Sequence, residues 1–336
     1  MLSWYSLAKR SAALGLSSLA VLATLFLPQP FLIAAAPGPR QPSLRPLRLI
    51  VFGADAATVV ARTRGLFAAE GLDVTVELTP SSTAQMRGLS AGAWEVASTA
   101  FDNVLAWSGR EGAEIVAVLQ TSNRVSLPVF VRPEIRDWPD LRGRRLAVDA
   151  VDTAFALVLR RILLAHGLDL TRGDYELVPE GATAQRFESM ARGDTAAAIL
   201  GPPWDAKASE AGLVRFGDHR EVLPDYPGGV LAVRRSWAKE HRDELVSFLR
   251  AWLAAARWAL EPANREAAIR LIAADQNLSP QAAAARLADL SADGALNLAG
   301  LQSVLDLRIQ FGLKPQLGPS LPSYYDREYY RAALGR

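Results

Sequence analysis

Short apolar runs alternate with stretches in which apolar residues recur every three or four positions, a pattern typical of strands followed by helices. In a first series we expect strands at 47–52, 73–78, 95–99 and 114–120, and helices at 57–70, 83–91 and 103–108. In a second series we expect strands at 145–148, 175–178 and 196–200, and helices at 153–166, 184–192 and 204–211. Strands that alternate with helices predict an α/β fold built on parallel sheets.

The two series contain an internal repeat. Thr83-Ala84-Gln85 in the first series has a counterpart in Thr183-Ala184-Gln185 in the second. Each triplet stands where a strand gives way to a helix, with Gly-Leu-Asp upstream and a glycine followed by a strand downstream. This agreement in order and spacing favours two copies of one structural plan over chance similarity in an alanine-rich chain.

Two apolar segments, 128–133 and 229–235, lie between and after the two series, and each contains Val-Arg near its end. We expect the chain to cross between two lobes at these segments, with lobe one at 37–130 plus 230–336 and lobe two at 131–229. Two extended crossovers form a hinge about which the lobes can close on a ligand. Helices at 237–260, 265–274, 280–290 and 298–311 complete lobe one, and the aromatic tail 324–330 is expected to pack on it.

The N-terminal segment has the layout of a secretory signal peptide. Residues 1–36 contain no acidic residue, and Lys9 and Arg10 precede an apolar run that ends in small residues. The alternative is an uncleaved anchor helix over 11–27, which is close to the length of a membrane span. We expect cleavage and a periplasmic product, because Pro28 and Pro30 interrupt a span.

Composition excludes several classes of protein. The 336 residues include no Cys, which rules out a disulfide scaffold, a zinc ribbon, a thiol nucleophile and the lipid attachment of bacterial lipoproteins. The formal charge of +2 is too small and too scattered for a nucleic-acid-binding protein. The three His have no metal-ligand spacing, and no cofactor motif is present, so we expect neither a metal nor a cofactor.

The stretches 64–74, 86–94 and 137–148 resemble the ABC-transporter solute-binding proteins for nitrate, sulfonates, taurine and thiamine-pyrimidine precursors. The resemblance rests on two sequence patterns, Gly65-x-Phe67-x-x-Glu70-Gly71-Leu72-x-Val74 and Asp140-Leu141-x-Gly143-x-x-x-Ala147-Val148. The resemblance implies a periplasmic-binding-protein fold of type II, with two α/β lobes joined by a two-segment hinge. It also implies a monomer that delivers a small molecule to an ABC permease in the cytoplasmic membrane.

Ligands of open α/β sheets bind beyond the carboxyl ends of the strands, where helices begin. The loops at these ends are rich in hydroxyls, amides and acids. The candidate ligand-binding residues are Asp55, Ser81, Ser82, Thr83, Thr99, Phe101, Asp102, Asn103, Asn123, Asp149, Asp152, Thr153, Glu180 and Trp204. Helix capping alone is an equal explanation for Ser82, Asp102 and Asp152.

Five of these candidates are acids: Asp55, Asp102, Asp149, Asp152 and Glu180. A desolvated carboxylate beside an anion is repulsive, so these loops disfavour a simple anion such as nitrate. An amino-bearing or heteroaromatic ligand, stacked on an aromatic ring and bonded to an Asp, fits better.

Two other functions remain open. The superfamily also resembles the eukaryotic pyrimidine synthases of thiamine biosynthesis, but those enzymes carry a cysteine-rich segment that is missing here. We therefore expect no catalytic residue. A ligand sensor for a membrane partner other than a permease is the second alternative, which the chain alone does not distinguish from transport.

Overall fold

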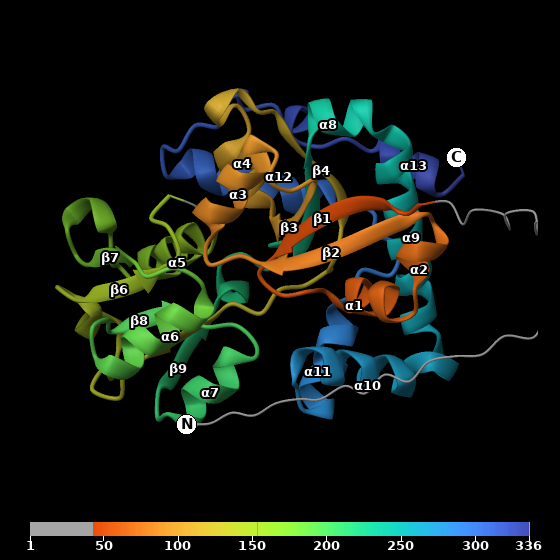
Figure 1. Cartoon of the computed structure of the whole chain (residues 1–336). Coiled ribbons are helices and arrows are strands. Elements are labelled where there is room, and N and C mark those ends of the chain that lie inside the picture. Colours follow the sequence, from red (N-terminus) through yellow and green to blue (C-terminus); the bar gives the residue numbers. More distant parts are fainter. Residues whose placement is uncertain (1–42, 153, 336) are drawn as a thin grey trace, which may run out of the picture. The chain divides into compact units, whose positions relative to one another are not determined.

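The computed structural model describes residues 43–152 and 154–335, which lie within one compact unit, Pro42–Arg336. It contains two five-stranded sheets, each covered by helices (Figure 1). The first sheet has the order β2-β1-β3-β10-β4, with β1 (Arg45–Val51), β2 (Leu72–Leu78), β3 (Val96–Ala100), β4 (Ile115–Gln120) and β10 (Gly229–Arg234). The second has the order β7-β6-β8-β5-β9, with β5 (Pro128–Val131), β6 (Arg145–Val148), β7 (Glu176–Pro179), β8 (Ala197–Ile199) and β9 (Val214–Asp218).

The two sheets follow the same plan. In each sheet three parallel strands lie side by side, and the next strand is antiparallel to them and comes from another part of the chain: β10 beside β3, and β5 beside β8. We call the first sheet with its helices lobe 1 and the second lobe 2. The α/β fold with two lobes is therefore confirmed.

The segments that connect the two sheets differ from the expected ones. The strand at 128–131 belongs to lobe 2 and the strand at 229–234 to lobe 1, so the chain passes between the sheets at 121–127 and 219–228. The expected lobe boundaries at 130 and 230 each fall inside a strand. An apolar Val-Arg strand was mistaken for a connector because periodicity identifies a strand but not the sheet that it joins.

The helices of lobe 1 that precede the crossover are α1 (Ala56–Thr63), α2 (Leu66–Ala69), α3 (Ser82–Ala91) and α4 (Phe101–Trp107), and those of lobe 2 are α5 (Ala154–Ala165), α6 (Thr183–Arg192) and α7 (Trp204–Glu210). Lobe 1 is completed by α8 (Arg235–Glu240), α9 (Arg242–Leu260), α10 (Arg265–Gln276), α11 (Pro280–Asp289), α12 (Leu298–Gln310) and α13 (Glu328–Ala333). Two expected helices are each divided in two. Gly65 adopts a φ of 70° between α1 and α2, and His241 leaves the helical conformation between α8 and α9.

The core of lobe 1 forms where α9 packs on α1, α2 and α13. Phe248 and Trp252 are fully buried there, and Phe67 stacks on Phe248 with ring centroids 5.1 Å apart. The C-terminal tail packs on the same lobe, as expected, because Tyr324 is fully buried and Tyr325 bridges to Ala117 in β4.

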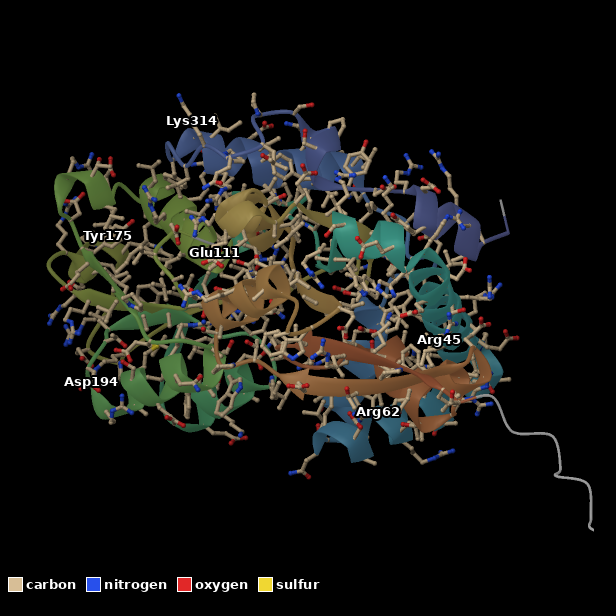
Figure 2. All side chains as sticks on the ribbon, turned by 45° about the horizontal axis from the view of Figure 1, so that its top comes forward. Arg45, Arg62, Glu111, Tyr175, Asp194 and Lys314 are labelled. Atoms are coloured by element: carbon tan, nitrogen blue, oxygen red, sulfur yellow. The ribbon has the colours of Figure 1, made fainter. Side chains whose placement is uncertain are left out.

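Charged side chains are spread over the surface of both lobes. Figure 2 shows Asp194 and Tyr175 on lobe 2, Arg45 and Arg62 on lobe 1, and side chains of both signs between them. No helix among the described residues has the length and apolar character that a membrane span requires. The expected signal peptide at 1–36 lies outside the described residues.

Candidate functional site: a cavity between the lobes

A cavity of about 560 Å³ lies where the carboxyl ends of the parallel strands of both lobes meet. Its lobe 1 wall contains Phe52, Gly53, Asp55, Ser98, Thr99, Asn103, Arg286 and Asp289, and its lobe 2 wall contains Asp149, Phe155, Thr183, Gln185, Arg186 and Trp204. The connecting segments contribute Thr121 to Leu127, except Asn123, and Pro227 and Gly228. A volume of this size accommodates a small organic molecule.

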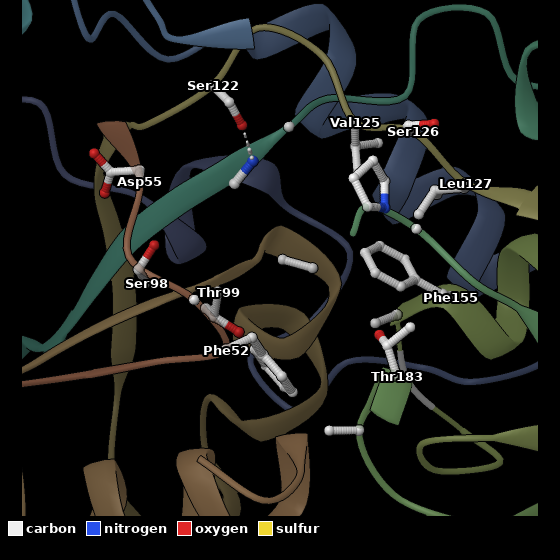
Figure 3. Close-up of a pocket in the computed structure, with 18 of the residues that line it drawn as sticks. Phe52, Asp55, Ser98, Thr99, Ser122, Val125, Ser126, Leu127, Phe155 and Thr183 are labelled. Carbon is white, nitrogen blue, oxygen red and sulfur yellow. Dashed lines mark hydrogen bonds between the residues drawn. The ribbon is translucent and has the colours of Figure 1, made fainter. Parts of the chain in front are cut away.

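Hydroxyl and amide groups line the lobe 1 side. Asn103 is 1% exposed, and its Nδ2 donates to the Thr99 hydroxyl at 2.9 Å. The Oδ1 of the same amide is buried and has no hydrogen-bond partner. Ser122 Oγ accepts from the backbone N–H of Gly229 at 2.9 Å, so its own proton is available to an acceptor (Figure 3). A buried acceptor without a donor is costly, and a ligand N–H or O–H group at Asn103 removes that cost.

Aromatic rings provide the apolar surface of the cavity. Phe52 extends from the end of β1, and Phe155 points into the cavity from the start of α5 (Figure 3). Trp204, the first residue of α7, packs against Phe187 with ring centroids 5.4 Å apart and has the Lys207 ammonium 4.2 Å from its ring centroid. Rings on both lobes suit a flat or apolar ligand body.

Two carboxylates on the wall occupy helix N-termini. Asp55 caps α1: it accepts from Thr58 N–H at 2.9 Å and Thr58 Oγ1 at 2.7 Å, and from Trp252 Nε1 at 3.0 Å. Burial raises the pKa of Asp55 above its ordinary value, and these hydrogen bonds offset part of that rise. Asp149 of lobe 2 accepts from the N–H of Ser82, the first residue of α3 in lobe 1, at 3.1 and 3.2 Å. The protein therefore places its own anions at the N-termini of α1 and α3.

Three guanidinium groups also face the cavity. Arg186 is buried and donates to the carbonyls of Gly181 at 2.8 Å and Ile199 at 3.3 Å, and to the Thr183 hydroxyl at 3.0 Å. Burial lowers its pKa to about 10, opposed by the nearby Asp149. Arg124 is exposed, whereas Arg286 is half-buried. Arg186 is thus committed to the structure of lobe 2, and the other two are better placed to meet a ligand.

The structure brings five of the predicted residues to the cavity wall: Asp55, Thr99, Asn103, Asp149 and Trp204. Eight others lie outside the wall: Ser81, Ser82, Thr83, Phe101, Asp102, Asn123, Asp152 and Glu180. Thr153 lies outside the described residues. Of the five acids used to characterise the ligand, only Asp55 and Asp149 reach the wall, and both are already bonded to helix N-termini.

The positions of the displaced candidates have local causes. Ser81, not Ser82, caps α3, with its Oγ accepting from Ala84 N–H at 3.1 Å. Phe101 is 1% exposed and belongs to the core. Asn123 is exposed, and its backbone N–H donates to the Asp289 carbonyl at 2.9 Å. Thr83 and Glu180 are not among the residues that line the cavity.

Asp102 and Asp152 take part in contacts between the lobes. Arg308 of α12 donates to Asp102 at 3.0 and 3.2 Å and to the Asp152 carbonyl at 2.9 Å, and Asp102 accepts from the N–H of Ala154 in lobe 2. Arg110 pairs with the Asp152 carboxylate at 3.0 Å. Burial raises the pKa of Asp102 above its ordinary value, and the Arg308 guanidinium offsets part of that rise. These acids are therefore bonded within the protein, away from the cavity.

Sequence reasoning missed several wall residues. Ser98, Thr121, Ser122 and Thr183 stand at strand ends or helix starts, where the same search for hydroxyl-rich loops could have found them. Phe155 and Arg124 also line the cavity and were not among the candidates. Arg286 and Asp289 carry no local signal, because they come from a helix far along the chain. No group of three or more His, Asp or Glu in the described part of the chain is placed to hold a metal ion.

The sequence profile of the NMT1-like family matches residues 49–273, which include every strand of both sheets except the first four residues of β1. The chain belongs to the NMT1-like family. The resemblance to ABC-transporter solute-binding proteins is thereby confirmed at the level of family and fold. The profile ends before α11, so Arg286 and Asp289 lie beyond the residues matched to the family.

Solved structures with the same fold include two binding proteins. The alkanesulfonate-binding protein SsuA from Xanthomonas axonopodis pv. citri, bound to MOPS, is 18% identical with a TM-score of 0.68, covering 83% of this chain and 98% of that chain. The periplasmic nitrate-binding protein NrtA from Synechocystis PCC 6803 is 14% identical with a TM-score of 0.72, covering 88% and 89%. At these identities the likeness shows the periplasmic-binding-protein fold.

A curated relative matches a shorter stretch. The bicarbonate transport ATP-binding protein CmpC of Synechococcus elongatus is 33% identical over 112 residues, 32% of this chain. The match spans 16% of the length of that relative.

Proposed function

We propose that this NMT1-like chain is the extracytoplasmic binding component of an ABC importer, which captures a small organic solute between its lobes and delivers it to a permease. The observation that carries the proposal is the cavity of about 560 Å³ lined by both lobes. A ligand that contacts both walls stabilises the closed arrangement over an open one. SsuA is an alkanesulfonate-binding protein, NrtA is a periplasmic nitrate-binding protein and CmpC is a transport ATP-binding protein, and these names support the same role.

Closure is proposed to occur about the connecting segments 121–127 and 219–228, which join the two sheets. Each lobe is proposed to consist of one sheet and the helices that pack on it. The two segments touch closely. A Cβ on Gly228 would stand 2.3 Å from the Ser122 carbonyl oxygen and 2.2 Å from the Ser122 Oγ, so glycine is required at this contact. Two short segments in contact at one point can bend together while each sheet stays intact.

The ligand is proposed to be an amino-bearing or heteroaromatic organic molecule. Asn103 Oδ1 offers an unpaired acceptor for an N–H or O–H group, and Phe155 and Trp204 offer ring surfaces. A simple oxyanion is disfavoured, because the N-termini of α1 and α3 already hold Asp55 and Asp149. Asp55 and Asp149 therefore occupy the helix N-termini at which an anionic ligand would bind, and they do not offer free carboxylates to a cationic ligand.

A ligand screen tests the proposal. The purified chain is heated with nitrate, taurine, alkanesulfonates, amines, pyrimidines and aromatic acids in turn. A ligand selective for the folded state raises the melting temperature by mass action. We expect a rise with an organic N–H-bearing compound and a smaller radius of gyration by X-ray scattering at saturation. Absence of any shift across the panel would contradict a binding role for these ligand classes, and a shift without compaction would contradict closure.

A further inference from the structure

Helix α11 brings a guanidinium group to the cavity from outside the part of the chain matched to the family. Arg286 lines the cavity together with Asp289 of the same helix. Its Nη2 donates to the carbonyl of Pro202 in lobe 2 at 3.3 Å, and its Nη1 would be 4.0 Å from a Cβ placed on Gly53 of lobe 1. The guanidinium therefore lies between the first loop of lobe 1 and the loop that leads into α7 of lobe 2.

Arg286 is poorly paired for a desolvated cation. In the described part of the chain, no carboxylate lies within 4.0 Å of it, and its hydrogen bonding is the one long contact to Pro202. A guanidinium has five N–H donors in a planar fork. Burial lowers the pKa of Arg286, while the more distant Asp289, Asp205 and Asp55 raise it. A half-buried cation with unused donors is stabilised by an anion that enters the cavity.

The other charges on the wall are already satisfied or offset. Asp55 caps α1, Asp149 accepts from the first N–H of α3, and Arg186 is bonded to carbonyls within lobe 2. Asp289 lies between two cations: burial raises its pKa, and Arg124 and Arg286 lower it. Asp289 therefore acts on both guanidinium groups, and in the described part of the chain neither of them has a carboxylate within 4.0 Å. A carboxylate on the ligand can supply the close partner that Arg286 lacks.

We propose, on the basis of the binding role proposed above, that Arg286 is the specificity-determining residue of this cavity and pairs with a carboxylate group on the organic ligand. A carboxylate matches the guanidinium fork with two parallel hydrogen bonds, which neither an amide nor an amine can form. Because Arg286 also reaches Pro202, the ion pair joins lobe 1 to the lobe 2 loop that precedes Trp204. The predicted ligand is therefore an N–H-bearing organic acid rather than a cation.

Three probes with one ring and the same ring amino group separate the possibilities: 6-aminopyridine-3-carboxylate, 6-aminopyridine-3-carboxamide and 6-amino-3-(aminomethyl)pyridine. Each is titrated calorimetrically into the full chain, its Arg286→Gln and Arg286→Lys variants, and the control Arg270→Gln. Arg270 is an exposed residue of the neighbouring helix α10. We expect the carboxylate to bind best, to weaken at least about tenfold in Arg286→Gln through loss of charge-assisted hydrogen bonds, and to be partly rescued in Arg286→Lys. The control should bind like the parent chain.

A second variant tests the sign of the charge effect. Asp289→Asn removes a carboxylate near Arg286, so it should strengthen binding of the carboxylate probe and leave the amide unchanged. Equal affinity of the parent and Arg286→Gln for the carboxylate, preference for the amide or amine, or no carboxylate binding at millimolar concentration would each overturn the inference. The ligand screen separates these outcomes from failure of the binding role, since a different panel member can still raise the melting temperature.

Discussion

Helices α3 and α6 hold equivalent places in the two lobes, yet their identical Thr-Ala-Gln triplets face different surroundings. The helices begin at Ser82 and Thr183, 101 positions apart, and both end at a glycine of positive φ, Gly92 and Gly193. The triplets begin at Thr83 and Thr183, only 100 positions apart. The repeat is present, but its most visible sequence match is one residue out of structural register.

One residue is 100° of rotation about a helix axis, so the same triplet presents different faces. Gln85 is buried, and its Nε2 donates to the carbonyls of Ile50 at 3.3 Å and Ser98 at 3.0 Å. The residue of α6 at the equivalent position is Arg186, which donates to the Ile199 carbonyl at the end of the corresponding strand β8. Gln185 instead is exposed and lines the cavity.

The comparison shows that structural register follows the glycine that ends the helix and the strand that succeeds it. An amide serves in lobe 1 where a guanidinium serves in lobe 2. The cation is the more demanding solution, because it must be desolvated and fully bonded. Because the triplets are offset by one residue, Thr183 and Gln185 line the cavity, whereas Thr83 and Gln85 do not.

The largest expected effect is from Arg186→Met. It removes the donors that serve Gly181, Thr183 and Ile199, so we expect a loss of about 3 kcal/mol in the free energy of unfolding, measured with urea. Arg186→Gln should lose less, because an amide can still reach a carbonyl as Gln85 does. The control Arg192→Gln, on the exposed side of α6, should change little. A cost below that of the control would refute the structural role of Arg186.

A smaller loss is expected from Gln85→Leu. The substitution leaves the carbonyls of Ile50 and Ser98 without their side-chain donor, which should cost about 1–3 kcal/mol by the same urea measurement. The matched control is Arg87→Gln, an exposed residue of α3. If Gln85→Leu costs more than Arg186→Met, the buried cation is not the more demanding of the two solutions.

The smallest effect on stability is expected from Gln185→Ala. Gln185 is exposed, so the free energy of unfolding should change by less than about 0.5 kcal/mol. Ligand affinity should fall by about three- to tenfold in calorimetry with the best compound of the screen, through loss of one hydrogen bond at the cavity wall. Glu188→Gln, exposed on the same helix but off the wall, serves as control. Unchanged affinity would remove Gln185 from the proposed site.

Much of the fold was accessible from the sequence. Strand β6 was predicted at its observed bounds, and the helix expected at 280–290 is α11, which Ser279 caps by accepting from Ala282 N–H. Strand β9 was missed, since its polar sequence Val-Arg-Phe-Gly-Asp lacks an apolar run. A local sequence pattern reveals a strand when burial of the strand's own apolar side chains stabilises it. The pattern fails when the strand is stabilised mainly by pairing with a neighbouring strand.

The candidate site was less accessible. Loops at strand ends were correctly placed, and they supplied Thr99, Asn103 and Trp204 of the wall. The role of each loop residue depends on helix phase, as Ser81 and Ser82 illustrate: Ser81 caps α3 with its side chain, and Ser82 donates its backbone N–H to Asp149 of lobe 2. Phase is set by packing against the sheet, which a single sequence does not display.

The sequence by itself determined the alternation of strands and helices, the duplicated plan and the family, because these depend on short-range periodicity and on motifs within one segment. Only the tertiary structure decided that β5 joins the second sheet and β10 the first, that Asp55 and Asp149 bind helix N-termini, and that Arg286 reaches the cavity. Those are contacts between residues far apart in the chain. Their geometry follows from how the sheets, helices and connecting segments pack together, which no local pattern encodes.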